Sequence, residues 1–179
     1  IAGYSLTADT SEQCLFFFYG KGRNGKGVFT RALTRILGGY AHRAQIETFS
    51  AGMSQHSTVI ASMVGKRLVY TAETEAGKQW AESRIKDLTG GDKIRAHFMR
   101  KDEFEFQPRF KLIISGNHEP AIDNCDDAMR GRFHVIPFDQ SFAGDKGDRV
   151  LGGKRRLRGH AEPGVGVFLP GLGGDVEWQ

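Results

Sequence analysis

A glycine-rich loop with one lysine is the part of this sequence best suited to bind phosphate. Residues 20–27 read Gly-Lys-Gly-Arg-Asn-Gly-Lys-Gly, between an apolar run and a helix-like segment. Glycines let successive backbone N–H groups face one point, and the start of a helix adds further N–H groups and a positive dipole end. Lys26 supplies a point charge for the outer phosphates. The residues expected to contact a nucleotide are Gly20, Gly22, Asn24, Gly25, Lys26, Gly27 and Val28.

The position after Lys26 departs from the usual phosphate-loop pattern. A Ser or Thr normally stands there and binds Mg²⁺ through its hydroxyl, whereas this chain has Gly27. A glycine-rich turn without function is the alternative interpretation of the loop. We favour phosphate binding because the segments before and after the loop read as the strand and the helix that such a loop requires.

Polar residues end two further apolar runs. Glu73 and Glu75 follow the run at residues 66–72, and Asn117 follows the run at 110–116. In open α/β sheets, ligands gather at the carboxyl ends of the strands. One carboxylate, with Glu73 as the candidate, can hold Mg²⁺ directly or through water, and a second can polarise an attacking water. An amide can hydrogen-bond that water or the γ-phosphate. Alternatively, the acids favour a helix start and Asn117 builds a turn.

Two arginines precede the last apolar run, at residues 133–138. Arg130 or Arg132 could act as an arginine finger, which is a guanidinium that contacts the nucleotide of a neighbouring subunit. Ordinary surface charge is the alternative. Along the chain, the phosphate loop is followed by the carboxylates, the amide and the arginines. Together these groups are the parts that phosphoryl transfer needs.

Basic residues also cluster where the pattern predicts a β-hairpin. Residues 93–99 and 104–106 alternate apolar and polar side chains around a charged tip. Cations at such a tip can follow a nucleic-acid backbone without reading its sequence. The candidate DNA contacts are Lys93, Arg95, His97 and Arg100. On charge alone, a solvated edge hairpin is the favoured alternative.

The elements that must position these residues follow from the spacing of apolar side chains. Four runs predict strands, at residues 14–19, 66–72, 110–116 and 133–138. Helices are expected at residues 1–6, 28–37, 59–64, 79–88 and 126–129, and residues 40–56 read as a polar connector. The alternation predicts an α/β fold, with a parallel sheet flanked by helices and one inserted hairpin.

Composition and length set the limits of this interpretation. The chain has 179 residues, a net charge of +4 and two cysteines, Cys14 and Cys125, which suits one domain in a reducing compartment. No apolar run approaches the roughly 20 residues needed to span a membrane. Ten of the 24 glycines fall within residues 144–179, where apolar periodicity is lost. We expect a core over residues 1–143 and a poorly ordered tail over 144–179.

The order of these motifs resembles the helicase domain of phage- and plasmid-type primase–helicases, members of superfamily 3 within the AAA+ ATPases. The resemblance covers roughly residues 1–140. It rests on the phosphate loop, on residues 65–75, on Leu-Thr-Gly-Gly-Asp at 88–92, on Gly-Asn-His-Glu-Pro at 116–120 and on residues 130–138. It implies that Lys26 binds the phosphates, that Glu73 and Glu75 stand at the Walker B position, and that Asn117 is the sensor.

The resemblance also implies an activity and its partners. Such proteins hydrolyse ATP with Mg²⁺ to drive translocation and unwinding of DNA during replication. The implied partners are single-stranded DNA or a replication fork, five further copies in a homo-hexamer and a primase domain upstream, in the cytoplasm of a bacterial host cell and without a membrane. His97 stands where an arginine is typical, and Gly131 interrupts an arginine-rich triplet. Two alternatives stay open: another P-loop phosphotransferase, or a remnant that binds nucleotide or DNA without turnover.

Overall fold

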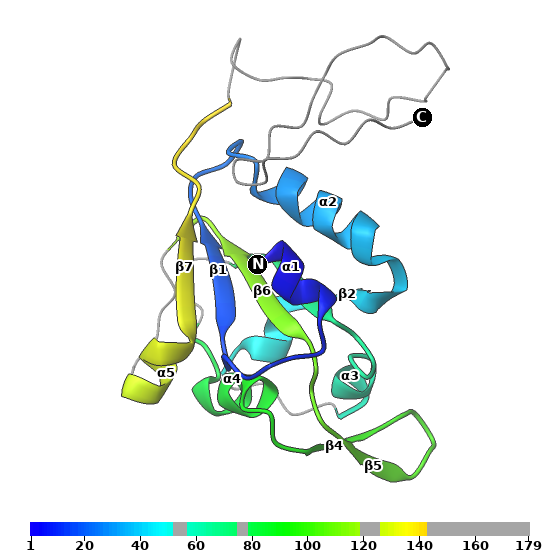
Figure 1. Cartoon of the computed structure of the whole chain (residues 1–179). Coiled ribbons are helices and arrows are strands. Elements are labelled where there is room, and N and C mark those ends of the chain that lie inside the picture. The colour runs from blue at the N-terminus through cyan, green and yellow to red at the C-terminus, as the bar shows by residue number, and fades with distance from the viewer. Residues whose placement is uncertain (52–56, 75–78, 119–125, 143–179) are drawn as a thin grey trace, which may run out of the picture.

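The computed structural model describes residues 1–51, 57–74, 79–118 and 126–142 (Figure 1). Glu75 and the glycine-rich segment at 144–179 lie outside the described residues. The predictions for them therefore stay predictions, as does the division of the chain at residue 143.

A parallel sheet of five strands forms the centre of the domain. Its spatial order is β2 (Ala41–Arg43), β3 (Leu68–Thr74), β6 (Lys111–Gly116), β1 (Leu15–Tyr19) and β7 (Phe133–Pro137). Every pair of neighbouring strands is parallel. The predicted α/β fold with a mainly parallel sheet is therefore confirmed.

The phenylalanine run of β1 supplies both faces of the sheet. Phe17 belongs to the core cluster on one face, while Phe16 and Phe18 belong to the cluster on the other. Successive side chains of a strand point to opposite faces, so an interior parallel strand is apolar throughout. This explains why four consecutive residues of β1, Leu15 to Phe18, are all buried.

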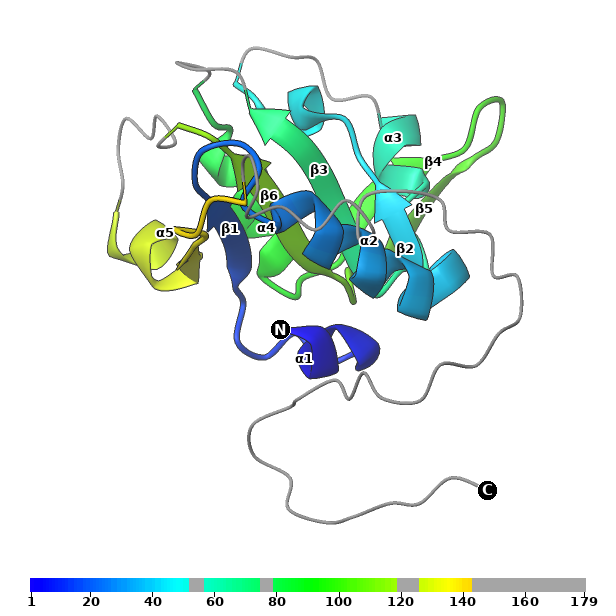
Figure 2. The same ribbon diagram turned by 90° about the horizontal axis from the view of Figure 1, so that it is seen from above.

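Helices cover the two faces. On one face, α2 (Lys26–Leu37) packs through Leu33 and Leu37, close to α1 (Ala2–Leu6) (Figures 1 and 2). The other cluster contains buried side chains of α4 (Glu82–Thr89) and α5 (Asp127–Arg132). Smaller elements complete the domain: α3 (Ser57–Ala61) and two 3₁₀ turns, η1 (Gly38–Tyr40) and η2 (Ile46–Phe49).

The buried Lys111 ties α1 to the sheet. Its Nζ donates to the carbonyl oxygen of Thr7 at 2.8 Å and lies 4.1 Å from the centre of the Tyr4 ring. Burial lowers the pKa of this ammonium, and the nearby carboxylate of Asp9 raises it by a smaller amount. The hydrogen bonds and the aromatic face replace the water that the ammonium loses.

The predicted hairpin is present. Strands β4 (Ile94–His97) and β5 (Glu103–Phe106) pair antiparallel, with Ile94 opposite Phe106. The hairpin extends from the lower end of the molecule in Figure 1, beside the start of β6.

Several predicted boundaries are wrong. Strand β2 lies within residues 40–56, which were predicted to be a connector. Helix α4 begins at Glu82 and not at residue 79, because Trp80 forms an isolated β-bridge with Ser50. Helix α3 begins and ends earlier than residues 59–64, and α5 continues to Arg132. Among the described residues, no helix is long and apolar enough to cross a membrane.

Candidate nucleotide site

The strand order creates a crevice at the carboxyl ends of β1 and β6. From β1 the chain crosses to β2 at one edge of the sheet, whereas from β6 it passes to β7 on the other side of β1. Ligands bind at such a switch point in open α/β sheets. The glycine loop begins there at Gly20, whose N–H donates to the carbonyl oxygen of Gly116 at 3.3 Å.

Lys26 and Asn117 meet in this crevice. The Nζ atom of Lys26 donates to Oδ1 of Asn117 at 3.1 Å, and it also donates to the carbonyl oxygens of Gly20 and, at 3.5 Å, Lys21. Lys26 is only 6% exposed. The structure therefore brings together two predicted site residues that lie 91 positions apart in the sequence.

The extension of β7 holds the loop in shape. Nδ2 of Asn24 donates to the carbonyl oxygen of Phe138 at 3.0 Å, and the N–H of Phe142 donates to that of Arg23 at 2.8 Å. Gly20 has φ +146°, and a Cβ there would lie 2.5 Å from both Nδ2 of Asn24 and the carbonyl oxygen of Phe138. These contacts could not be predicted from the sequence, because they involve main-chain atoms, which every residue type has.

A cavity of about 1260 Å³ opens beside the loop. Residues 22–28 line it together with one face of α2 and residues of β2, β3 and β6. Its further lining residues are Thr30, Arg31, Thr34, Arg43, Ala44, Gln45, Ile46, Glu47, Tyr70, Thr71 and Ser115. None of these was among the predicted site residues. This volume exceeds the roughly 300–1,000 Å³ of typical ligand pockets, so the cavity has room for a nucleotide.

Of the two predicted carboxylates, Glu73 lies at the neighbouring strand end. Glu73 is part of β3, beside Thr74, which pairs with Gly116 of β6 after a register shift. No three His, Cys, Asp or Glu side chains group as a metal site within the part of the chain that the structure describes.

The two arginines lie far from the loop of their own chain. They belong to α5, which precedes β7, and β7 runs parallel to β1 with Phe133 opposite Leu15. The length of β1 therefore separates them from the loop by roughly 15 Å along the sheet. Figure 1 shows α5 and the loop at opposite ends of the strands.

Arg130 and Arg132 differ in their contacts. Arg132 donates from Nη1 to the carbonyl oxygen of Ala128 at 2.8 Å and from Nη2 to Oε1 of Gln13 at 2.9 Å. The side chain of Arg130 is exposed, and no hydrogen bond or ion pair joins it to another described residue.

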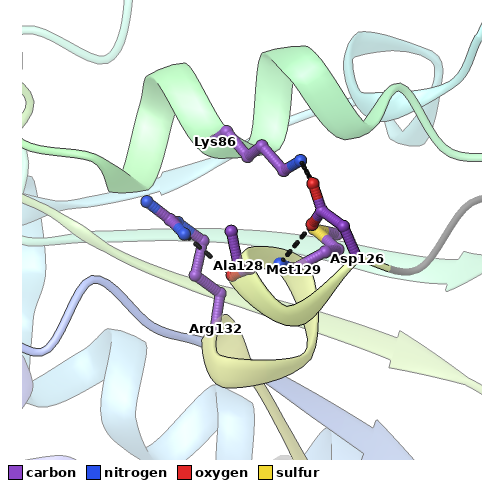
Figure 3. Close-up of polar contacts among 5 residues, drawn as sticks. All are labelled: Lys86, Asp126, Ala128, Met129 and Arg132. Carbon is purple, nitrogen blue, oxygen red and sulfur yellow. Dashed lines mark hydrogen bonds and ion pairs between the residues drawn. The ribbon is translucent and has the colours of Figure 1, made fainter.

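An ion pair fixes the start of α5 (Figure 3). Asp126 accepts from Nζ of Lys86 at 2.6 Å and caps the helix by accepting from the N–H of Met129 at 2.8 Å. The hydrogen bond from Lys86 and then that from Met129 lower the pKa of this carboxyl.

The predicted DNA residues share the hairpin but differ in their contacts. Lys93 and Arg100 are exposed, whereas Arg95 pairs with Glu105 at 3.4 Å. A ring nitrogen of His97 forms a hydrogen bond with Oγ of Ser57, which ties the strand to α3. At the tip, Phe98 stacks on Phe104 with ring centres 5.2 Å apart. The hairpin thus carries cations and one half-exposed aromatic ring, and its first strand is hydrogen-bonded to α3.

Comparison with known proteins now gives the family. The model of a family of unknown function, DUF5906, matches residues 18–132. The chain belongs to this family. The matched range contains the loop, β3, Asn117 and both arginines of α5.

Curated viral relatives resemble most of the chain. A protein of Acanthamoeba polyphaga mimivirus with a provisional helicase name, L207/L206, is 29% identical over 76% of the chain. A Frog virus 3 protein with a similar name, 022R, and Primase D5 of Fowlpox virus are each 26% identical over 79%. The chain spans only 15–19% of the length of these three relatives. The predicted similarity to helicases is thus confirmed, while the phage or plasmid type stays a prediction.

A solved structure supports the fold. The apo A form of the NrS-1 C-terminal region has a TM-score of 0.57 and 22% identity, over 72% of this chain and 29% of that one.

Proposed function

We propose that this chain is the ATPase core of a DNA helicase or translocase that acts in replication. The observation that carries the proposal is the 3.1 Å contact between Nζ of Lys26 and Oδ1 of Asn117 at the switch point of the sheet. The strand order β2-β3-β6-β1-β7 supports a P-loop fold of the AAA+ type. The helicase and primase names of the relatives support DNA as the substrate on which the ATPase acts.

Each group near the loop has a role in hydrolysis. The loop N–H groups and Lys26 bind the β- and γ-phosphates, and they hold the nucleotide against the start of α2. Because Asn117 contacts the ammonium of Lys26, its amide is within reach of a γ-phosphate bound there or of the attacking water. The tight backbone approach at Gly20 and the hydrogen bond from Asn24 keep these groups in place before the reaction.

Glu73 and Glu75 are the proposed partners of Mg²⁺ and of the attacking water. Glu73 would hold the ion, directly or through water, at the end of β3. The ion supplies charge neutralisation for the phosphate oxygens. Gly27 has no side-chain oxygen to offer the ion, so in this proposal the chain relies on β3 and on the phosphates themselves.

The distance between α5 and the loop favours an arginine that acts between subunits. We assign this role to Arg130, because its guanidinium is exposed while that of Arg132 is held by Ala128 and Gln13. Such a heterologous contact, repeated by rotation, closes a ring. The proposed assembly is a homo-hexamer.

The hairpin is the proposed contact with single-stranded DNA or a fork. Lys93, Arg95, His97 and Arg100 would follow the phosphates, and Phe98 offers a surface on which a base can stack. A primase domain upstream is the proposed companion in the full-length protein. Figure 1 shows the hairpin away from the loop, so the proposed contacts with ATP and with DNA lie in separate parts of the subunit.

A steady-state ATPase assay, with and without single-stranded DNA, tests the proposal. We expect Mg²⁺-dependent turnover that DNA stimulates and that Lys26→Ala removes, while circular dichroism shows an intact fold. Turnover that ignores DNA would favour another phosphotransferase. Nucleotide binding through Lys26 without turnover would identify a remnant, and unchanged turnover in Lys26→Ala would exclude the proposed site.

A further inference from the structure

Arg31 projects over the loop position that lacks a hydroxyl. Gly27 and Arg31 lie four residues apart on α2, and helix side chains at this spacing share a face and lean toward the amino end. Nη1 of Arg31 lies 3.5 Å from the place that a Cβ on residue 27 would occupy. Both residues line the cavity beside the loop.

The glycine leaves the space beside the guanidinium open. A Cβ alone at residue 27 would already be in van der Waals contact with Nη1, so the outer atoms of a Ser or Thr side chain would compete with the guanidinium for the same space. Arg31 is exposed to the cavity, and no carboxylate among the described residues pairs with it. The guanidinium is therefore available to an anion.

We infer that Arg31 binds the polyphosphate chain of the nucleotide held by its own subunit. The inference rests on the proposed nucleotide site and adds a residue to it. A guanidinium stays charged at all working pH values and can donate two parallel hydrogen bonds to phosphate oxygens. Next to Lys26 and the loop N–H groups, it supplies positive charge at the place where a metal-binding hydroxyl is missing.

One consequence separates Arg31 from an ordinary surface cation. If Arg31 carries part of the charge that Mg²⁺ otherwise supplies, polyphosphate binds even when the metal is removed. Loss of Arg31 then weakens metal-free binding more than binding with Mg²⁺. Arg35 is the matched control, because it lies one turn further along α2, is also exposed, and does not line the cavity.

Calorimetric titration with inorganic tripolyphosphate, in EDTA and in excess Mg²⁺, tests this assignment on the whole chain. We expect Arg31→Gln to weaken metal-free binding about tenfold or more, as for a lost charge-assisted hydrogen bond. Arg31→Lys should recover part of the affinity because it restores a charge without the planar fork. Arg35→Gln should bind as the unaltered chain does, and thermal unfolding should show that all variants fold.

The variants distinguish failure of this inference from failure of the proposed site. If Arg31→Gln binds like Arg35→Gln in EDTA while Lys26→Ala loses binding, the nucleotide site stands and the role of Arg31 is excluded. If Arg31→Gln lost the same affinity in EDTA and in Mg²⁺, the idea that Arg31 carries charge otherwise supplied by Mg²⁺ would also be excluded. If the unaltered chain binds no tripolyphosphate, or if Lys26→Ala binds it normally, both the site and the inference are wrong.

Discussion

At the scale of single residues, Gly20 is the position where the loop tolerates the least change. An added Cβ would lie 2.5 Å from a carbonyl oxygen and from Nδ2 of Asn24, and the φ of +146° strains any other residue. We expect Gly20→Ala to lower the free energy of unfolding by at least about 2 kcal/mol and to weaken nucleotide binding. Urea unfolding measures the first effect, and titration with ATP measures the second.

Gly22 provides the control for Gly20. A Cβ at Gly22 meets no atom within 4 Å, so Gly22→Ala should change the unfolding free energy by less than about 0.5 kcal/mol. Equal stability of the two variants would show that the backbone approach at Gly20 does not constrain the loop.

Asn117 tests whether the contact with Lys26 serves catalysis. Asn117→Ala removes the amide that we propose lies near the γ-phosphate but leaves the loop intact, so we expect turnover of ATP to fall about 100-fold. Affinity for ATP should fall much less, because the loop and Lys26 supply most of the binding. Single-turnover hydrolysis and equilibrium binding separate the two effects.

The neighbouring His118→Ala is the control, since His118 is exposed. If Asn117→Ala and His118→Ala hydrolyse ATP at the same rate, then Asn117 is only the acceptor that holds Lys26 in the absence of nucleotide.

Residue types singled out two side chains that the structure brings into contact, and they missed most residues that line the cavity. Lys26 and Asn117 could be predicted as neighbours because glycine spacing and strand ends carry a chemical signal. Arg31 could have been noted from its spacing of four residues from Gly27, since both fall on one helix face. Arg43 and Glu47 could not, because their approach to the loop depends on how β2 and η2 fold back toward it.

At the scale of elements, the longer interior strands could be predicted from the local sequence, whereas the short edge strand β2 could not. The apolar runs of β1, β3 and β6 are buried on both faces and could be predicted from composition alone. Strand β2 has three half-exposed or exposed residues at the sheet edge, so its pairing with β3 gives no periodic signal. The end of α5 could not be predicted either, because Gly131 disfavours a helix that the Asp126 cap and Met129 packing hold in place.

The start of α5 should depend on pH. The pKa of Asp126 lies below its ordinary value of 3.8, because Lys86 and the N–H of Met129 stabilise the charged form. A lowered folded-state pKa stabilises the fold above the unfolded-state value, and this stability is lost as pH falls through the folded value. We expect Asp126→Asn to lower the Tm at pH 7 and to have no effect near pH 2, as measured by thermal melts.

Asp126→Ala separates the cap from the charge. Asn at this position can still accept from the N–H of Met129, whereas Ala cannot, so Asp126→Ala should be the less stable variant at both pH values. A Tm difference between the unaltered chain and Asp126→Asn that is equal at pH 7 and pH 2 would contradict the ion pair with Lys86.

At the scale of the whole molecule, the parallel sheet separates the glycine loop from α5, the two parts of the proposed catalytic site. The loop lies at the carboxyl ends of the strands, and α5 lies at their amino ends (Figure 1). A subunit can therefore present its loop to one neighbour and Arg130 to the other. In the proposed ring, hydrolysis would depend on assembly, because each loop would need Arg130 of a neighbouring subunit.

Mixing two inactive variants tests this dependence. Lys26→Ala lacks the loop cation but keeps Arg130, and Arg130→Ala keeps the loop, so each pure ring should be inactive. In an equal mixture with random exchange, about a quarter of the interfaces join an intact loop to an intact arginine, and ATP turnover should recover to about that fraction. Arg132→Ala in place of Arg130→Ala should lose stability through its contacts with Ala128 and Gln13. If Arg130 acted within its own subunit, no mixed interface would be complete and the mixture would stay inactive.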